Sequence, residues 1–254
     1  MATLAGMRAA AAPILALDCS TQVMSVALRG PLGVRLHEGE AGAQASATLL
    51  PQIQAMLREQ GLRVADLQAV AFGCGPGAFT GLRTACAVAQ GLSLGAGCPV
   101  LPVDSLMLVA EETAEPAAPP AALAAIAMDA RMGEVYAGLY RWCGPDAPAG
   151  WEVVQPPCLC DPADLPGRWR SAWCAQPGTL WVAGSGLALL PPGSVPAGTP
   201  ARAGGQRAAA LLRLAERLLV AGSGIDPAQA LPLYLRDKVA LTVAERAAAP
   251  APAA

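Results

Sequence analysis

The segment AVAFGCGPGAFTGLRTACAVAQGLSLGAGCPVLPV (69–103) decides the fold that we expect for this chain. Its first four residues (69–72) form an apolar run short enough to be a buried strand, and a glycine-rich turn follows (73–81). The proline-free run at 82–96 predicts a helix, and the apolar run at 100–103 predicts a second strand. Strand, turn, helix and strand in this order build parallel sheets, so we predict an α/β protein.

The helix expected at 82–96 carries small residues at four-residue spacing. One row contains Ala87, Gly91 and Gly95, and a second row contains Gly81, Ala85, Ala89 and Ser93. Residues four apart share a helix face, so each row leaves a flank with little side-chain bulk. Because a glycine costs a helix about 1 kcal/mol relative to alanine, a close contact must offset that cost. The contact is either with the chain's own sheet or with a helix of another protein.

Outside this unit, the pattern of strands and helices occurs twice. The first half predicts strands at 14–19, 23–28 and 33–38 and helices at 49–60 and 105–112; the second predicts strands at 123–128, 134–141, 151–160 and 180–183 and a helix at 206–220. In both halves a strand ends in aspartate and is followed by a hairpin, which suggests two related subdomains at 14–115 and 121–246. We expect disorder in an alanine-rich extension at 1–13 and in an alanine- and proline-rich tail at 247–254.

Composition excludes several functional classes. The 254 residues are 54% hydrophobic, yet no uncharged apolar run is long enough to span a bilayer, so we expect no membrane partner. A net charge of -2 gives no basis for autonomous nucleic-acid binding. The 8 cysteines include no Cys-x-x-Cys pair, and His37 is the sole histidine, so we predict no metal site. Reduced thiols in a cytoplasmic protein are the expected state.

Two strand ends are candidates for a degenerate nucleotide site. Asp18 ends the first strand and Asp129 ends the corresponding strand of the second half, and such aspartates hold magnesium in actin-like ATPases and sugar kinases. Those proteins place a glycine in the following turn, where backbone N–H groups reach phosphate oxygens, and this chain has Ser20 there. An ATPase or kinase-like enzyme with its own active site is therefore the alternative function.

The glycine-rich turn allows a second enzymatic hypothesis. Gly73, Gly75 and Ala78 satisfy the dinucleotide fingerprint, and Asp104 ends the next strand where it would contact a ribose. Pro76 removes a backbone donor, however, and the Walker A pattern fails because no lysine follows the last glycine. A purely structural turn is the favoured interpretation. We expect no catalytic residue. A nucleophile–base pair would have to use His37, the sole histidine, and His37 lies on a predicted hairpin strand that should face solvent.

Five strings resemble the TsaB (YeaZ) family. They are ILALDCST (14–21), LLP (49–51), GCGPGAFTGLR (73–83), MDARMGEVY (128–136) and YLR (234–236), within a resemblance that extends from about residue 14 to 246. This resemblance implies two actin-like (ASKHA, ribonuclease H-like) subdomains, each a mixed sheet with flanking helices. It also implies a non-catalytic scaffold that dimerises with TsaD for the N6-threonylcarbamoylation of adenosine 37 in tRNAs reading codons that begin with A.

The resemblance further implies how the chain meets its partners. TsaD would bind through a helical bundle, TsaE would belong to the complex, and tRNA would be contacted indirectly; ATP and metal would be used by the partner subunits. Self-association through the same helices is an open alternative. The expected interface residues lie on the helices at 49–60 and 82–96, and they are Leu49, Leu50, Ile53, Met56, Leu57, Leu82, Ala85, Cys86, Ala89 and Gly91. Ala89→Trp or Gly91→Leu is expected to abolish the heterodimer and leave the fold intact.

One departure from the family pattern bears on catalysis. Many relatives carry a His-Ser-Glu string where this chain has Ala45, Ser46 and Ala47, and the resemblance implies that TsaD binds its metal through histidines of this helix. The departure argues further against a metal site here and is compatible with a scaffold role.

Peptidase activity is the least supported hypothesis, because the sequence offers neither a metal site nor a nucleophile–base pair for it.

Overall fold

The computed structural model describes residues 12–40, 45–115, 118–145, 147–175 and 180–236. Of the expected N-terminal extension only Ala12 and Pro13 are described, and the expected C-terminal tail lies outside the described residues. The carbonyl oxygens of these two residues accept hydrogen bonds from Arg29 Nε at 3.1 Å and from the Gln68 amide at 2.9 Å. Their backbone therefore belongs to the folded part of the chain.

The first half of the chain forms a five-stranded mixed sheet of order β3-β2-β1-β4-β5. Its strands are β1 (Ile14–Asp18), β2 (Val23–Gly30), β3 (Gly33–Glu40), β4 (Ala69–Gly75) and β5 (Val100–Asp104). β1 pairs antiparallel with β2 and parallel with β4, so the predicted hairpin and the predicted parallel unit meet on β1. The helices of this half are α2 (Ala45–Glu59), α3 (Phe79–Ala96) and α4 (Ser105–Thr113).

The second half repeats this topology. Its strands are β6 (Leu123–Asp129), β7 (Val135–Trp142), β8 (Trp151–Cys160), β9 (Leu180–Ala183) and β10 (Ala201–Arg202), in the order β8-β7-β6-β9-β10. Its helices are α5 (Leu165–Ala175) and α6 (Arg207–Val220). Short 3₁₀ helices lie at Val64–Asp66, Pro148–Gly150, Pro162–Asp164, Ser185–Leu189 and Pro227–Gln229. Both sheets thus place their first strand in the centre, and the predicted pair of mixed sheets with flanking helices is confirmed.

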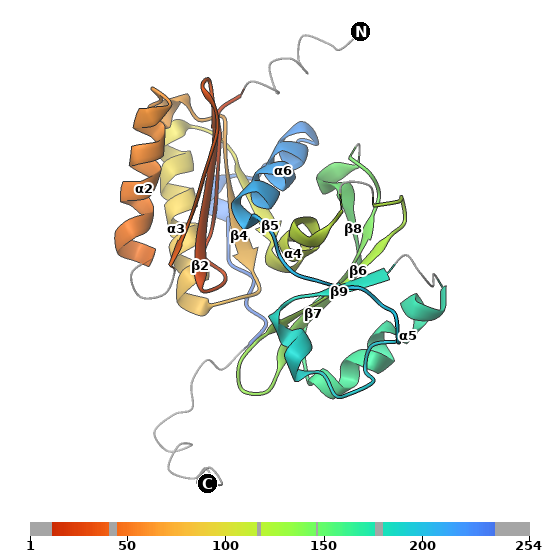
Figure 1. Cartoon of the computed structure of the whole chain (residues 1–254). Coiled ribbons are helices and arrows are strands. Elements are labelled where there is room, and N and C mark those ends of the chain that lie inside the picture. Colours follow the sequence, from red (N-terminus) through yellow and green to blue (C-terminus); the bar gives the residue numbers. More distant parts are fainter. Residues whose placement is uncertain (1–11, 41–44, 116–117, 146, 176–179, 237–254) are drawn as a thin grey trace, which may run out of the picture.

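The elements stack in five layers, with α2 and α3 on one outer face and α5 on the other (Figure 1). Between the sheets lie α4 and α6, and they contribute to one buried cluster that contains Ala16 and Leu101 from the first sheet and Ile126 and Trp181 from the second. Separate clusters fill the space beneath α2 and α3 and beneath α5. Because the central core contains residues from both sheets, the subdomains share one hydrophobic interior.

Three features differ from the sequence-based expectation. α6, expected in the second subdomain, contacts strands β1 to β5 of the first sheet, and Ile225 forms a bridge with Val100 of β5. α2 begins at Ala45, before the predicted start at residue 49, and Pro51 lies inside the helix. The two-residue strand β10 was not predicted, because a segment this short carries no alternation. The residues that follow the second sheet therefore pack on the first sheet, and the two subdomains do not correspond to two separate halves of the sequence.

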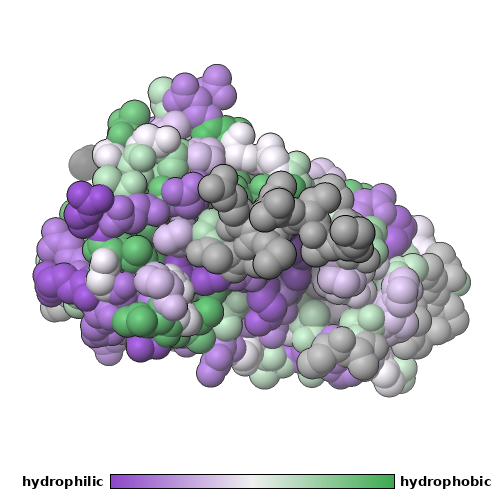
Figure 2. All heavy atoms as spheres, turned by 90° about the horizontal axis from the view of Figure 1, so that it is seen from above, coloured by the Kyte–Doolittle hydropathy of each residue, from purple (hydrophilic) through white to green (hydrophobic). Residues whose placement is uncertain are grey.

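The surface mixes polar and apolar side chains. On the face shown in Figure 2, hydrophobic residues lie scattered among hydrophilic ones. Within the described part of the chain, no helix combines the length and apolar character that a membrane span requires.

Candidate functional site

A cleft of about 630 Å³ opens between the two sheets. One side is lined by the β1–β2 turn and the glycine-rich turn, and the other by the end of β6 and the β6–β7 turn; the residues are Ser20, Thr21, Gln22, Val23, Pro76, Gly77, Ala78, Phe79, Ser105, Leu106, Met128, Asp129, Ala130, Arg131, Met132, Tyr136, Ser185, Arg207, Leu233, Tyr234, Leu235 and Arg236. Its volume lies in the range of small-molecule sites. The polar groups that face it decide which ligands it accepts.

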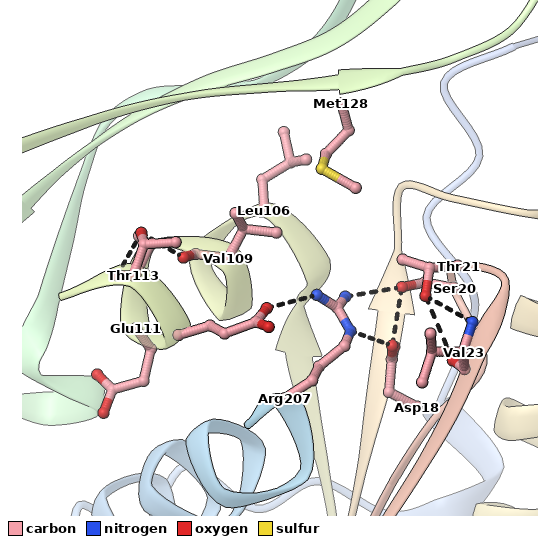
Figure 3. A network of polar contacts seen from close by, with 12 residues as sticks. Asp18, Ser20, Thr21, Val23, Leu106, Val109, Glu111, Thr113, Met128 and Arg207 are labelled. Carbon is pink, nitrogen blue, oxygen red and sulfur yellow. Dashed lines mark hydrogen bonds and ion pairs between the residues drawn. The ribbon is translucent and has the colours of Figure 1, made fainter. Parts of the chain in front are cut away.

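The floor of the cleft is a buried ion-pair network. Arg207, from the start of α6, donates from Nε to Asp18 Oδ2 at 2.8 Å and from Nη2 to Ser20 Oγ at 3.0 Å (Figure 3). Its Nη1 lies 3.3 Å from Glu112 Oε2, and Ser20 Oγ donates to Asp18 Oδ2 at 3.0 Å. Asp18 is completely buried. Figure 3 shows Leu106 and Met128 on the opposite side, so apolar groups face this network.

This network neutralises the aspartate that would otherwise hold a metal. Burial alone would lower the pKa of Arg207, but the carboxylates of Asp18 and Glu112 outweigh it and raise that pKa, so the guanidinium stays charged. Burial raises the pKa of Glu112, although Arg207 acts in the opposite direction. The guanidinium of Arg207 therefore supplies the counter-charge of the buried Asp18 carboxylate. The sequence did not suggest this pairing, because Arg207 is 189 residues away from Asp18.

The predicted aspartate on the opposite side is also engaged. Asp129 lines the cleft, but its carboxylate accepts from the Arg131 backbone at 2.7 Å and forms an ion pair with the Arg131 side chain at 3.4 Å. Among the described side chains, no three histidine, cysteine or acidic residues come together as a metal site requires. The structure therefore places Ser20 and Asp129 at one cleft and Asp18 beneath it, with each of the three already hydrogen-bonded.

Close packing accounts for the glycine-rich turn. A Cβ on Gly77 would lie 2.5 Å from the Ser20 carbonyl oxygen, and a Cβ on Gly81 would overlap the Cys19 carbonyl oxygen. Gly73 faces Asp18, whose Oδ1 is buried without a hydrogen-bond partner in the described part of the chain. The glycines thus let β4 and α3 approach the end of β1. This geometry supports the structural interpretation of the turn over the dinucleotide one.

Asp104, the suggested ribose contact, serves the fold instead. It caps α4 by accepting hydrogen bonds from Leu106 N at 2.8 Å and Met107 N at 3.3 Å, and it accepts a third from Tyr140 Oη at 2.7 Å. Since Tyr140 belongs to β7, this carboxylate joins the two sheets. Both of its oxygens are occupied within the protein, so the structure gives no support to a ribose contact.

Asp104 predicts a measurable pH dependence of stability. Burial raises its pKa above the ordinary 3.8, although the Tyr140 hydrogen bond and the helix cap act in the opposite direction. Above pH 3.8 and up to the raised pKa, the folded chain holds a proton that the unfolded chain has lost, so this group's contribution to the free energy of unfolding falls as the pH rises. Asp104→Asn removes this loss and keeps a good N-cap. The unfolding free energy of Asp104→Asn minus that of the wild type, both measured in urea, should therefore increase as the pH is raised above 3.8.

A carboxylate with the opposite shift provides the control. The Arg63 hydrogen bond lowers the pKa of Asp66 below its ordinary 3.8. As the pH rises from the lowered pKa to 3.8, the wild type should gain stability that Asp66→Asn does not gain, and above 3.8 the difference between the two should stay constant. If the difference between Asp104→Asn and the wild type does not change with pH, Asp104 does not titrate in the way described.

Two cysteines next to the cleft, Cys19 and Cys74, are held in the protonated state. Burial, followed by the charge of Asp18, raises the pKa of Cys19 to about 12; burial and then Asp104 do the same for Cys74. Both thiols therefore stay protonated at neutral pH. His37 lies on β3, at a part of the first sheet that does not line the cleft.

The outer face of α2 and α3 is the second candidate site. Eight of the ten expected interface residues pack in the chain's own core, namely Leu49, Ile53, Met56, Leu57, Leu82, Ala85, Cys86 and Ala89, each at most 4% exposed. They lie beneath the helices because this face of each helix covers the apolar side of the first sheet. The expected docking surface is corrected accordingly, and Ala89→Trp would enlarge a core side chain instead of a surface one.

The other two expected interface residues, Leu50 and Gly91, lie on the accessible side of these helices. Leu50 is 40% exposed, Leu94 is 66% exposed, and Ala87 is also exposed. A Cβ atom added at Gly91 would have no neighbouring side chain or other segment of the chain within 4 Å. Ala87, Gly91 and Leu94 follow one another at helical spacing, so they form a row along α3, which we call the α3 row. Of the two rows of small residues, the one that begins with Gly81 faces the sheet and the one that contains Gly91 faces outward.

Comparison with known proteins connects this geometry to tRNA modification. Residues 39–178 match the family model described as "TsaD: tRNA N6-adenosine threonylcarbamoyltransferase". The chain is 33% identical to the "tRNA threonylcarbamoyladenosine biosynthesis protein TsaB" of Escherichia coli, over 89% of this chain and 96% of that protein. The Haemophilus influenzae protein of the same name is 44% identical over 48% of this chain and 51% of its own length.

Two solved structures from Pseudomonas aeruginosa have the same fold. YeaZ superposes with a TM-score of 0.71 at 31% identity, covering 88% of this chain and 100% of that one. A second structure, described as an uncharacterized protein with similarity to peptidase YEAZ, has a TM-score of 0.74 at 33% identity and covers 89% of this chain and 100% of its own.

Proposed function

Because this chain belongs to the TsaB (YeaZ) family, whose members take part in tRNA threonylcarbamoyladenosine biosynthesis, we propose that it is the non-catalytic subunit that dimerises with TsaD. In this proposal the complex modifies adenosine 37 of tRNAs that read codons beginning with A. TsaE joins the same cytoplasmic complex, the partner subunits use ATP and metal, and tRNA contacts this chain only indirectly.

The observation that carries the proposal is the outward-facing α3 row. Gly91 leaves an open strip on α3, and Leu94 on the same helix and Leu50 on α2 present exposed apolar surface. Small residues in a row let a second helix approach closely, and the exposed Leu94 in the same row supplies apolar area for it to bury. A glycine in the middle of an 18-residue helix also weakens that helix, and a docked partner would offset this cost.

The chemistry of the cleft favours a supporting role over an enzymatic one. Arg207 pairs with Asp18, Asp129 is held by Arg131, and Asp104 is used as a cap and as a link between the sheets. Each carboxylate that a nucleotide site would need is thus already engaged by this chain's own residues. These contacts of the described residues support the scaffold proposal over the ATPase and dehydrogenase alternatives.

Gly91→Leu tests the proposal. The variant should fold normally, because the position is open and leucine is a better helix former than glycine. It should weaken TsaD binding about 30-fold or more, because a bulky side chain keeps the facing helix away from α3. Purified variant and wild type are titrated with TsaD, and complex formation is followed by calorimetry and on a sizing column.

Gly167→Leu is the matched control. Gly167 is also an exposed helical glycine without an atom within 4 Å of a built Cβ, but it belongs to α5 on the opposite outer face of the molecule. This variant should bind TsaD as the wild type does and should restore tRNA modification when mixed with TsaD, TsaE, tRNA and the threonylcarbamoyl donor. Equal affinity of the two variants for TsaD would refute the α3 row as the docking surface.

A further inference from the structure

Three strings that the sequence analysis singled out meet at the mouth of the cleft. They are residues 73–83, 128–136 and 234–236, and each of them contributes to the cleft lining. The proposed docking surface uses only the outer side of α3, so it does not explain the second and third strings. Residues 230–236, which we call the clasp, connect the other two.

On the first subdomain, the clasp is fixed to the glycine-rich turn and to the first turns of α3. The Leu233 amide donates to the Cys74 carbonyl oxygen at 2.7 Å. The ring of Tyr234 lies 4.9 Å from the ring of Phe79, and Arg83 Nε donates to Tyr234 Oη at 3.1 Å. The Arg83 guanidinium also covers the Phe79 ring at 4.1 Å. Tyr234 is therefore held by an aromatic contact and a hydrogen bond at the beginning of α3.

On the second subdomain, the clasp ends in Arg236, which is bound to the β6–β7 turn. Its Nη1 forms an ion pair with Glu134 Oε2 at 2.7 Å. Its Nη2 donates to the carbonyl oxygens of Ala130 at 3.1 Å and Arg131 at 3.3 Å. The Arg236 side chain is only 15% exposed, whereas that of Glu134 is 37% exposed. A planar guanidinium, with several N–H donors, can bind these three acceptor oxygens at once, whereas a lysine ammonium is a single point charge.

The turn that Arg236 holds has an unfavourable backbone conformation. Arg131, Met132 and Gly133 have φ angles of 65°, 57° and 76°, so three successive residues lie in the left-handed region. Two of them carry long side chains, for which this region is disfavoured. Such conformations persist where surrounding contacts hold them. Arg236 supplies four of these contacts, including one from Nη1 to Met132 Sδ at 3.5 Å, so the conformation of the turn depends on the position of the clasp.

We infer that the clasp couples the beginning of α3 to the β6–β7 turn across the cleft, so that displacing Tyr234 from Phe79 and Arg83 releases the turn on the other subdomain. The coupling path runs from Tyr234 through two peptide units to Arg236 and then to the carbonyl oxygens of the turn. It goes beyond the proposed function, since it is a property of the isolated chain. In the complex, the clasp would transmit a structural change at the beginning of α3 to the β6–β7 turn, which lines the cleft.

Tyr234→Ala tests the coupling in the full-length chain without a partner. The amide of Ala130, bonded to Glu134 O at 2.9 Å, and the amide of Glu134, bonded to Arg131 O at 3.2 Å, report on the turn by hydrogen exchange. Both should exchange about tenfold faster in the variant, although no hydrogen bond joins Tyr234 to the turn. Tyr234→Phe keeps the ring and loses the Arg83 hydrogen bond, so its effect should be intermediate.

Two further variants define the outcomes. Leu231→Ala changes a clasp residue that is 74% exposed, and the turn should exchange within about twofold of the wild type. Arg236→Ala removes the direct contacts and should accelerate exchange in the turn. If Arg236→Ala does so and Tyr234→Ala does not, Arg236 is a local cap and the inference fails. It also fails if Tyr234→Ala accelerates exchange equally in β1 and β4, because that indicates general destabilisation. Neither outcome depends on TsaD binding.

Discussion

Arg207→Met is expected to lower the free energy of unfolding by about 3–5 kcal/mol. The side chain is 8% exposed, and it lies between the carboxylates of Asp18 and Glu112. Methionine fills a similar volume but leaves two buried carboxylates without a counter-charge. Asp18 is affected most, because it is fully buried and one of its oxygens already has no hydrogen-bond partner among the described residues. Equilibrium unfolding in urea at neutral pH measures the loss.

A double variant separates the charge effect from the loss of packing. Asp18→Asn combined with Arg207→Met removes both members of the closest pair, so it should be less destabilising than the sum of the two single changes. Arg35→Met is the matched control, because Arg35 forms a 3.8 Å surface pair with Glu59 and is 45% exposed. Its effect should stay within about 0.5 kcal/mol. A loss below about 1 kcal/mol for Arg207→Met would contradict the role assigned to this network.

Gly81→Ala is expected to destabilise the protein by about 2–3 kcal/mol, although alanine is the better helix former. A Cβ at this position would overlap the Cys19 carbonyl oxygen, so α3 would have to move away from the end of β1. The overlapping atom belongs to the backbone of a buried strand end, which cannot rotate aside as a side chain can. Thermal and urea unfolding measure the loss.

Gly91→Ala provides the opposite result on the same helix. Nothing lies within 4 Å of a Cβ at Gly91, so this change should stabilise the isolated chain by about 0.5–1 kcal/mol through helix propensity. If the two variants have the same stability, the glycine-rich turn does not need its close approach to β1, and the structural interpretation of the turn is wrong.

Local sequence patterns determined most of the fold. Short apolar runs gave the strands, helical spacing gave the helices, and the recurrence of strand, aspartate and hairpin predicted two sheets of the same topology. These features depend on residues within a few positions of one another, and local periodicity and turn chemistry encode them. The strings at 14–21 and 73–83 also predicted the family, because each is a contiguous segment whose residues follow one another along the chain.

The candidate site was only partly predictable. Ser20 and Asp129 do line one cleft, but the sequence pattern cannot distinguish an aspartate that is free for a ligand from one paired with Arg207. The same limit applies to the α3 helix. Its two rows of small residues have the same spacing, and spacing alone does not say which row faces the sheet.

The sequence by itself determined most of the strands and helices, the recurrence of strand, aspartate and hairpin in the two halves, and the family. Only the tertiary structure decided that α6 returns to the first sheet, that Arg207 reaches Asp18, and that the clasp carries Tyr234 and Arg236 to opposite sides of the cleft. The physical reason is that these contacts join residues more than a hundred positions apart. They depend on how the two sheets pack on α4 and α6, and no local preference of the chain encodes that arrangement.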